Sequence, residues 1–206
     1  MLIHHRGAAP SVDPSAYVAP NATLVGDVRI GPRVRVMYGA VLDAEGATIE
    51  VGEASVITEH AVLRATAVEG ARHPVVLGDH VFVGPHATLL GCVVERCAYL
   101  ATGITILQGA HIGAGACIAV GALVHARSRV GAEFFVGPHT VAVGNPARVL
   151  TPDRIDEVNA AIREVNFAGA AFGINHEWTD RISRYERMAE VRVEEFGAHL
   201  GDREVT

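Results

Sequence analysis

Six scattered side chains are of the types that hold ions or move protons: Asp43, Glu59, His60, Arg64, His73 and His86. Asp43 and Arg64 are a carboxylate and a guanidinium, which together could position an anion. His60 and His86 carry imidazoles that, with Glu59, could bind a divalent transition metal. Because the members of each group lie far apart in sequence, the fold must bring them together.

His73 stands in an irregular stretch, residues 65–76, next to Pro74. An imidazole in such a loop could act as a general base that removes a proton from a hydroxyl or an amine. A histidine in a surface loop is also an ordinary feature without any chemical role. The position of His73 therefore leaves both interpretations open.

An apolar residue recurs at every sixth position along most of the chain, and this period predicts the fold. A small residue usually stands two places earlier, and Gly often follows. A period of six fits a short strand followed by a turn, and three such units close a triangular coil of roughly 18 residues. We therefore predict a left-handed parallel β-helix of about seven coils over residues 1–150. The repeated residues are Val12, Val18, Leu24, Ile30, Val36, Leu42, Val51, Ile57, Leu63, Leu77, Val83, Leu89, Val94, Leu100, Ile106, Ile112, Ile118, Val124, Val130 and Val136.

Stacked coils should place equivalent residues above one another, about 4.8 Å apart. Asp43 and Arg64 each follow the third inward residue of a coil, so we expect them to stack and to form an ion pair. His60 and His86 each stand three places after an inward residue, so they should be neighbours. The alternatives are a purely structural salt bridge for the first pair and an outward, solvent-facing position for the second.

Three interruptions of the series follow Leu42, Leu63 and Leu89. Each of these residues is the third member of its coil, so the interruptions fall at one edge of the triangular prism. We expect the loops 43–50 and 65–76 to project from this edge and to lie close together. Functional sites are often built on loops that a rigid scaffold holds in place.

Residues 151–206 lack the repeat and are predicted to form a helical tail. Thr151 is expected to cap a first helix, and a linker is expected at residues 167–177. A second helix should follow Thr179 and pack its apolar stripe on the prism or on a neighbouring subunit. The stripe consists of Ile182, Tyr185, Ala189 and Phe196.

The composition argues against several classes of partner. The formal net charge is −6 and no block of basic residues exists, which disfavours nucleic acid and anionic membranes. No apolar run reaches the roughly 18 residues of a membrane span. The N-terminal residues lack the apolar stretch of a signal peptide, so we expect a cytoplasmic protein. His80, His111 and His125 occupy outward repeat positions and are read as structural or solvent-facing.

Four segments within residues 10–150 resemble γ-class carbonic anhydrases: 26–31 (GDVRIG), 77–84 (LGDHVFVG), 91–92 (GC) and 143–149 (VGNPARV). The resemblance implies a homotrimer with sites at the subunit interfaces. It also implies a zinc ion held by three His, two from one subunit and one from its neighbour. The last segment is shared with hexapeptide acetyltransferases, in which a loop His at a subunit boundary acts as general base, and His73 fits that role by position.

The zinc ligands of that family do not carry over to this sequence. Its three His positions fall at Arg64, Pro85 and Leu90 when the motifs are aligned. Zinc needs three donors to hold and activate water, whereas Pro and Leu donate nothing and Arg stays cationic. We therefore predict that ordinary γ-type carbonic anhydrase chemistry is absent. Other family positions fall at Asp43, Ala44 and Glu45 and at Val56, Thr58 and Glu59.

Three hypotheses follow. The first is a γ-carbonic-anhydrase-like homotrimer that binds or converts a small molecule, an anion at Arg64 being one option, in the interface cleft. The second is an acyltransferase with a coenzyme A thioester as co-substrate, and the third is a non-catalytic trimeric assembly module. The candidate catalytic residues are His73, Arg64 and Glu59, and the candidate substrate contacts are Arg64, Asp43, His86 and Tyr38. A divalent metal at His60 and His86 is the alternative to the missing zinc site.

Overall fold

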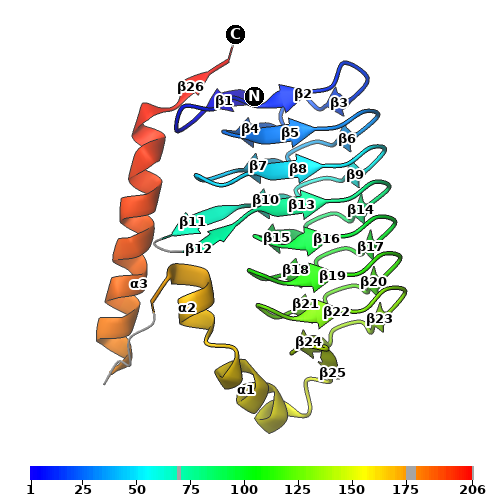
Figure 1. Cartoon of the computed structure of the whole chain (residues 1–206), viewed down its shortest axis with the longest axis vertical. Coiled ribbons are helices and arrows are strands. Elements are labelled where there is room, and N and C mark those ends of the chain that lie inside the picture. Colours follow the sequence, from blue (N-terminus) through cyan, green and yellow to red (C-terminus); the bar gives the residue numbers. More distant parts are fainter. Residues whose placement is uncertain (69–70, 175–179, 206) are drawn as a thin grey trace.

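The computed structural model describes residues 1–68, 71–174 and 180–205, which form a parallel β-helix followed by helices (Figure 1). The strands of successive coils pair in parallel and build three sheets, here called faces A, B and C in chain order. The inward residues of the predicted series fill a core of Val, Ile, Leu and Ala. The six-residue period therefore predicted the fold correctly.

Face A is a ten-stranded sheet in which β25 and β26 are antiparallel additions at the two ends. Its eight parallel strands give one coil more than the sequence predicted, because β1 precedes the first repeat residue, Val12. The strands are β1 (Leu2–His4), β4 (Thr23–Val25), β7 (Val41–Asp43), β10 (Val62–Arg64), β15 (Thr88–Leu90), β18 (Thr105–Ile106), β21 (Leu123–Val124), β24 (Val141–Val143), β25 (Arg148–Leu150) and β26 (Arg203–Glu204).

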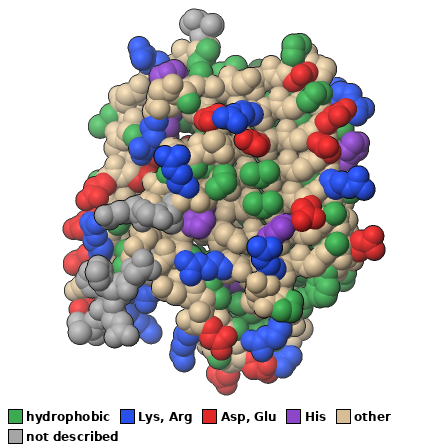
Figure 2. Space-filling view, viewed as in Figure 1, with side chains coloured by type: hydrophobic (Ala, Val, Ile, Leu, Met, Phe, Trp, Pro, Cys, Tyr) green, Lys and Arg blue, Asp and Glu red, His purple; other side chains and the backbone are tan. Residues whose placement is uncertain are grey.

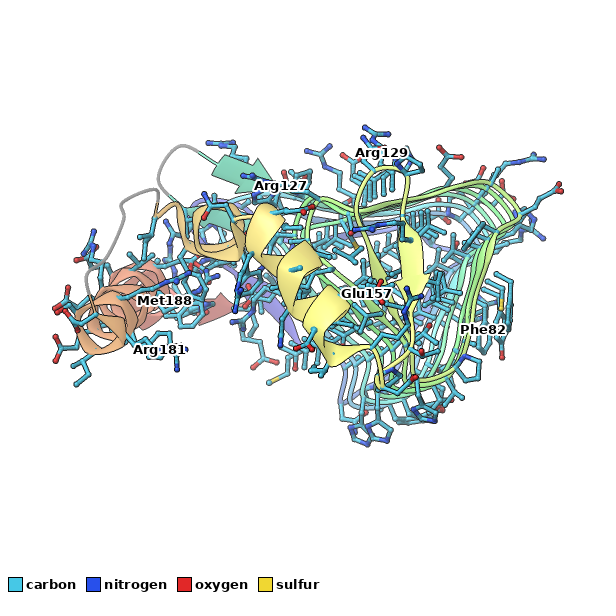
Figure 3. All side chains as sticks on the ribbon, turned by 90° about the horizontal axis from the view of Figure 1, so that it is seen from below. Phe82, Arg127, Arg129, Glu157, Arg181 and Met188 are labelled. Carbon is cyan, nitrogen blue, oxygen red and sulfur yellow. The ribbon has the colours of Figure 1, made fainter. Side chains whose placement is uncertain are left out.

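Faces B and C are seven-stranded parallel sheets. Face B contains β2 (Ser11–Val12), β5 (Val28–Ile30), β8 (Ile49–Val51), β13 (Val75–Leu77), β16 (Val93–Val94), β19 (His111–Ile112) and β22 (Arg129–Val130). Face C contains β3 (Tyr17–Val18), β6 (Arg35–Val36), β9 (Val56–Ile57), β14 (Phe82–Val83), β17 (Tyr99–Leu100), β20 (Cys117–Ile118) and β23 (Phe135–Val136). Figure 3 shows the triangular cross-section, with Arg129 on face B and Phe82 on face C.

Two corners of the prism carry the candidate residues. At the A–B corner the chain passes from face A to face B, and at the C–A corner it passes from face C to face A. The interruptions of the repeat lie at the A–B corner, where β11 (Thr66–Val68) and β12 (Ala71–His73) form a small antiparallel hairpin. The loops 43–50 and 65–76 are neighbours there, as predicted, since the Val75 amide donates to the Thr48 carbonyl over 3.0 Å.

In the C-terminal tail, α1 (Ile155–Glu164) packs against β24 at the end of the prism (Figure 1). The helices α2 (Phe167–Phe172) and α3 (Arg181–Phe196) and the short 3₁₀ helix η1 (Gly197–Gly201) lie along the A–B corner. Thr151 does not cap α1, because residues 151–154 form a turn in which the Arg154 amide donates to the Thr151 carbonyl. The predicted linker contains α2, whose Phe167 packs against His125. Thr179 and the end of that linker lie outside the described residues.

The apolar stripe predicted for α3 is only partly correct. Ile182 and Tyr185 are 72% and 57% exposed, so they do not pack on the prism. Phe196, at the end of α3, does reach the prism and lies under the guanidinium of Arg64. Within the described residues, no helix combines the length and the apolar character needed to cross a bilayer.

Candidate functional site

The candidate residues separate into two groups at opposite ends of face A. Asp43, Arg64 and His73 lie at the A–B corner, whereas Tyr38, Glu59, His60 and His86 lie at the C–A corner. The three-residue strand β10 runs from one corner to the other. Within a single chain, the predicted catalytic and substrate-binding residues therefore do not form one site.

Asp43 and Arg64 form the ion pair that the repeat predicted. They are paired in register on β7 and β10, and Arg64 Nη2 lies 2.9 Å from Asp43 Oδ2. Asp43 is 3% exposed, and its other oxygen accepts the Glu45 amide over 3.1 Å. Arg64 lies 4.8 Å above the Phe196 ring, and its buried Nε–H has no hydrogen-bond partner among the described residues.

A cluster that sequence reasoning missed adjoins this pair. The Nε2 atom of His199 lies 2.7 Å from Glu45 Oε2, and His199 Nδ1 lies 2.9 Å from Asp202 Oδ2. His5 Nδ1 donates to the other Asp202 oxygen over 2.6 Å, and the rings of His5 and His199 stack 4.3 Å apart. These four residues, here called the histidine–carboxylate cluster, join the turn after β1, the loop 43–50 and the tail.

Burial and charge shape this cluster. Glu45 is fully buried and His5 is 2% exposed. Burial lowers the pKa of His199, but hydrogen bonds to Asp202 and Glu45 outweigh it, and the net pKa is raised. Burial raises the pKa of Asp202, but hydrogen bonds to His199 and His5 outweigh it, and the net pKa is lowered. The cluster therefore favours a charged His199 between two carboxylates.

Arg6 borders the cluster on its solvent side. Its Nη2 donates to Glu45 Oε1 over 2.9 Å and to the Glu195 carbonyl over 2.8 Å, while its Nε donates to His5 Nε2 over 3.2 Å. The Arg6 side chain is 39% exposed and also lines a cavity of about 510 Å³ between the β11–β12 hairpin and α3. Arg6 thus connects the buried carboxylate of Glu45 with an open cavity.

At the C–A corner, His60 and His86 are neighbours, as their register predicted. Their exposed rings stack 5.4 Å apart at 9°, and both residues occupy the left-handed region with φ of 57°. Glu59 accepts the His86 amide through its backbone carbonyl. Within the described part of the chain, ligand atoms of Glu59, His60 and His86 are not gathered as a group of three, whereas those of His5, Glu45 and His199 are.

Tyr38 also lies at the C–A corner and is 46% exposed. Its hydroxyl oxygen accepts a hydrogen bond from the Tyr17 hydroxyl over 3.3 Å, and its backbone carbonyl accepts the His60 amide. Tyr38 is therefore available to a ligand or a partner at this corner, but it does not approach Arg64 within one chain.

His73 ends β12 at the A–B corner and lies against Gly91, leaving no room there for a β-carbon. Burial lowers the pKa of His73, which a hydrogen bond to the backbone of Ala170 in α2 partly offsets, and Arg127 lowers it further. Its Nε2 is buried and has no hydrogen-bond partner among the described residues. The lowered pKa favours the neutral form of the His73 imidazole, and α2 of the tail contacts this ring.

The three positions that align with the family's zinc ligands hold Arg64, Pro85 and Leu90, whose side chains differ from the His ligands in chemistry. Leu90 pairs in register with Arg64 across β15 and β10, so a guanidinium and an isobutyl group stand side by side. Pro85 lies at the C–A corner, where its carbonyl accepts the Gly103 amide. These side chains present zinc with no neutral nitrogen, no thiolate and no carboxylate.

Known proteins place the chain in a family. No protein-family model matches it. It is 36% identical over 144 residues to the mitochondrial γ carbonic anhydrase 1 of Arabidopsis thaliana, covering 69% of this chain and 50% of that protein. The chain thus spans about half the length of this curated relative. It is 30% identical over 167 residues to a carbonic anhydrase of Geobacillus kaustophilus, covering 80% of this chain and 86% of the relative.

A solved structure supports the fold alone. The crystal structure of the product of the Bacillus cereus BC4754 gene superposes with a TM-score of 0.51 at 23% identity, covering 94% of this chain and 96% of that chain. Together with the repeat, the parallel faces and the sequence relatives, this shows that the chain belongs to the γ-carbonic-anhydrase-like family of hexapeptide-repeat proteins.

Proposed function

We propose that this protein is a homotrimer that binds a small anion at Arg64 and does not hydrate CO₂ through the zinc site of its family. The observation that carries the proposal is the buried Arg64 Nε–H, which has no acceptor among the described residues. A buried donor without a partner is costly, and an anion oxygen would satisfy it.

The surroundings of Arg64 suit a small anion. Asp43 holds one end of the guanidinium and Phe196 supports its face, so the group is oriented before any ligand arrives. The Arg64 side chain is 32% exposed, which leaves a route for a carboxylate or bicarbonate of modest size. An oriented guanidinium binds a planar oxyanion through two parallel hydrogen bonds.

The proposal that the family's zinc chemistry is absent is based on the side chains at the three ligand positions. Arg64, Pro85 and Leu90 occupy the ligand positions, and a permanent positive charge at Arg64 would repel a zinc ion. A guanidinium at a former metal position supplies positive charge of its own. Anion binding is therefore the property of the ancestral site that these residues can retain.

The trimer is supported by the character of the faces. Several outward side chains of face B are charged, and Arg29 pairs there with Asp27 and Glu50, although Val93 is also exposed on this face. Figure 2 shows basic, acidic and His side chains spread over this side. Face C instead presents aromatic residues, with Phe82 stacked on Tyr99. Exposed apolar patches of this kind mark contacts between proteins, here between face C and a second copy.

The test combines activity and binding on untagged protein. Stopped-flow CO₂ hydration should stay at background with or without added Zn²⁺. Titration with bicarbonate or acetate, followed by calorimetry, should show binding that Arg64→Gln abolishes and that Tyr38→Phe, at the opposite corner, leaves in place. Zinc-dependent hydration that survives Arg64→Ala, or equal anion binding by Arg64→Gln, would overturn the proposal.

Acyl transfer with His73 as general base is the second candidate. The observation in its favour is the partly buried ring of His73, whose pKa burial lowers and whose Nε2 has no hydrogen-bond partner among the described residues. Coenzyme A should then raise the melting temperature of the wild type, and His73→Gln should abolish turnover of an acyl-CoA. Because α2 covers His73 and limits the access of a substrate to its ring, the anion-binding proposal is favoured over acyl transfer.

The cytoplasmic location of this protein stays a prediction. The Arabidopsis relative is named as mitochondrial.

A further inference from the structure

The histidine–carboxylate cluster contains a set of metal-ligand atoms that the repeat does not explain. Nitrogen atoms of His5 and His199 and an oxygen of Glu45 all lie within 4.8 Å of one another. Two imidazoles and one carboxylate are a common ligand set for Zn²⁺ and for Fe²⁺ and Co²⁺. All three residues lie outside the positions that correspond to the family's zinc ligands.

Asp202 supplies a second layer of contacts around these ligands. Its two oxygens accept hydrogen bonds from the Nδ1 atoms of His5 and His199, at 2.6 and 2.9 Å. This arrangement leaves the Nε2 atom of each ring directed to the Glu45 side, at 3.8 and 2.7 Å from its oxygens. A carboxylate on the far nitrogen fixes the ring orientation and raises the basicity of a metal-ligating histidine.

The charges of the cluster also favour a cation. Glu45 and Asp43 are buried, with exposed fractions of 0% and 3%, and Asp202 adds a third carboxylate beside them. In the structure, Arg6 donates to both Glu45 Oε1 and His5 Nε2, so its guanidinium occupies two of the prospective ligand atoms. Because Arg6 is 39% exposed and lines the cavity of about 510 Å³, it can move aside without being buried elsewhere.

We propose that His5, Glu45 and His199 form a binding site for a divalent transition metal ion, most suitably Zn²⁺, with Asp202 orienting both imidazoles. The ion takes the place of Arg6 and of the proton shared by His199 and Glu45, which is released to solvent. The stacked rings tilt toward each other so that each nitrogen comes within about 2.0–2.1 Å of the ion.

This site differs in kind from the two other metal positions considered for the chain. It needs no neighbouring subunit, since the residue that follows β1, the loop 43–50 and the tail of one chain supply every ligand. It also does not use His60 and His86, which lie at the C–A corner without a carboxylate on their ring nitrogens among the contacts described. Metal binding would tie the tail to the β-helix.

Co²⁺ titration of untagged, chelator-treated protein tests the proposal, with visible absorption and equilibrium dialysis as readouts. We expect one ion per chain, displaced by Zn²⁺. His199→Gln should abolish binding, and Asp202→Asn should weaken it about 10–100-fold. His199 and Asp202 are partly exposed, so both variants should stay folded. The matched control, His60→Gln combined with His86→Gln, should bind as the wild type does.

Two results would overturn the proposal. One is the absence of Co²⁺ binding to the wild type at millimolar concentration. The other is binding that persists in His199→Gln but disappears in the His60→Gln, His86→Gln double variant, which would place the ion at the C–A corner. Neither result bears on anion binding at Arg64, which is measured separately, so failure of one proposal does not imply failure of the other.

Discussion

The two corners that flank face A each carry a stacked pair of histidines, but the pairs have opposite character. His60 and His86 at the C–A corner are exposed, and their rings stack at 5.4 Å. His5 and His199 at the A–B corner stack at 4.3 Å and are held by Asp202 and Glu45. The comparison teaches that the coils alone can stack His60 on His86, whereas the stack of His5 on His199 and the carboxylate partners of their ring nitrogens require a second segment of chain, the tail.

The largest effect should come from removing the buried carboxylate of the A–B corner. Glu45→Ala removes the acceptor of His199 Nε2 and one acceptor of Arg6 Nη2, and breaking a buried ion pair on one side costs about 3–5 kcal/mol. Urea denaturation should show this loss of the free energy of unfolding. Glu45→Gln keeps an acceptor oxygen and should lose less. A Glu45→Ala variant as stable as the wild type would mean that the cluster does not stabilise the tail.

The Asp43–Arg64 pair should give the next largest effect. Each single change to Ala leaves the other charge partly buried and unpaired, which should cost about 1–3 kcal/mol. The double variant should cost less than the sum, because no unpaired charge remains. A double-mutant cycle by chemical denaturation measures this coupling. Strict additivity would show that the two charges contribute independently in spite of their contact.

A smaller effect should appear in the pH dependence of stability at the A–B corner. Burial lowers the pKa of His125, whose ring packs against Phe167 of α2. A histidine in the unfolded chain takes up its proton near pH ~6.5, before the folded one does. As the pH falls through this value, His125 therefore lowers the free energy of unfolding. The loss of stability between about pH 8 and about pH 5.5 should shrink in His125→Gln. An unchanged loss would contradict the assignment.

The smallest effect should come from the C–A corner. His86 has a left-handed φ of 57°, and Gly103 and Gly121 occupy the equivalent turn of later coils with φ of 66° and 64°. Glycine adopts this conformation without strain, which offsets the lost ring contact with His60. Thermal unfolding of His86→Gly should stay within about 0.5 kcal/mol of the wild type. If His86→Gly lost as much free energy of unfolding as Asp43→Ala, the two corners would not differ in their contribution to stability.

The sequence predicted those features that depend on the repeat and missed those that do not. The contact of Asp43 with Arg64 and the stacking of His60 on His86 follow from counting residues, because each coil repeats the last. The roles proposed for these residues are a separate question that only the binding experiments address.

The histidine–carboxylate cluster could not be found in the same way. His199 meets Glu45 across 154 positions, and His5 meets Asp202 across 197. None of these residues belongs to the six-residue series, so no period connects them. The one hint was Glu45, an acidic residue in a loop that interrupts the repeat. The position of the tail follows from tertiary packing of α2, α3 and η1, which local patterns do not encode.

The antiparallel strand β26 has a consequence for how these molecules can associate. A parallel β-helix exposes unpaired backbone at its ends, and further molecules could add there to build a fibre. At the β1 end, β26 occupies this edge, with Ile3 paired to Glu204 and His4 to Arg203. The strand is only two residues long and carries exposed charged side chains, which make a poor template for growth. β25 covers β24 at the other end of the same sheet, so lengthwise polymerisation through face A is blocked at both ends.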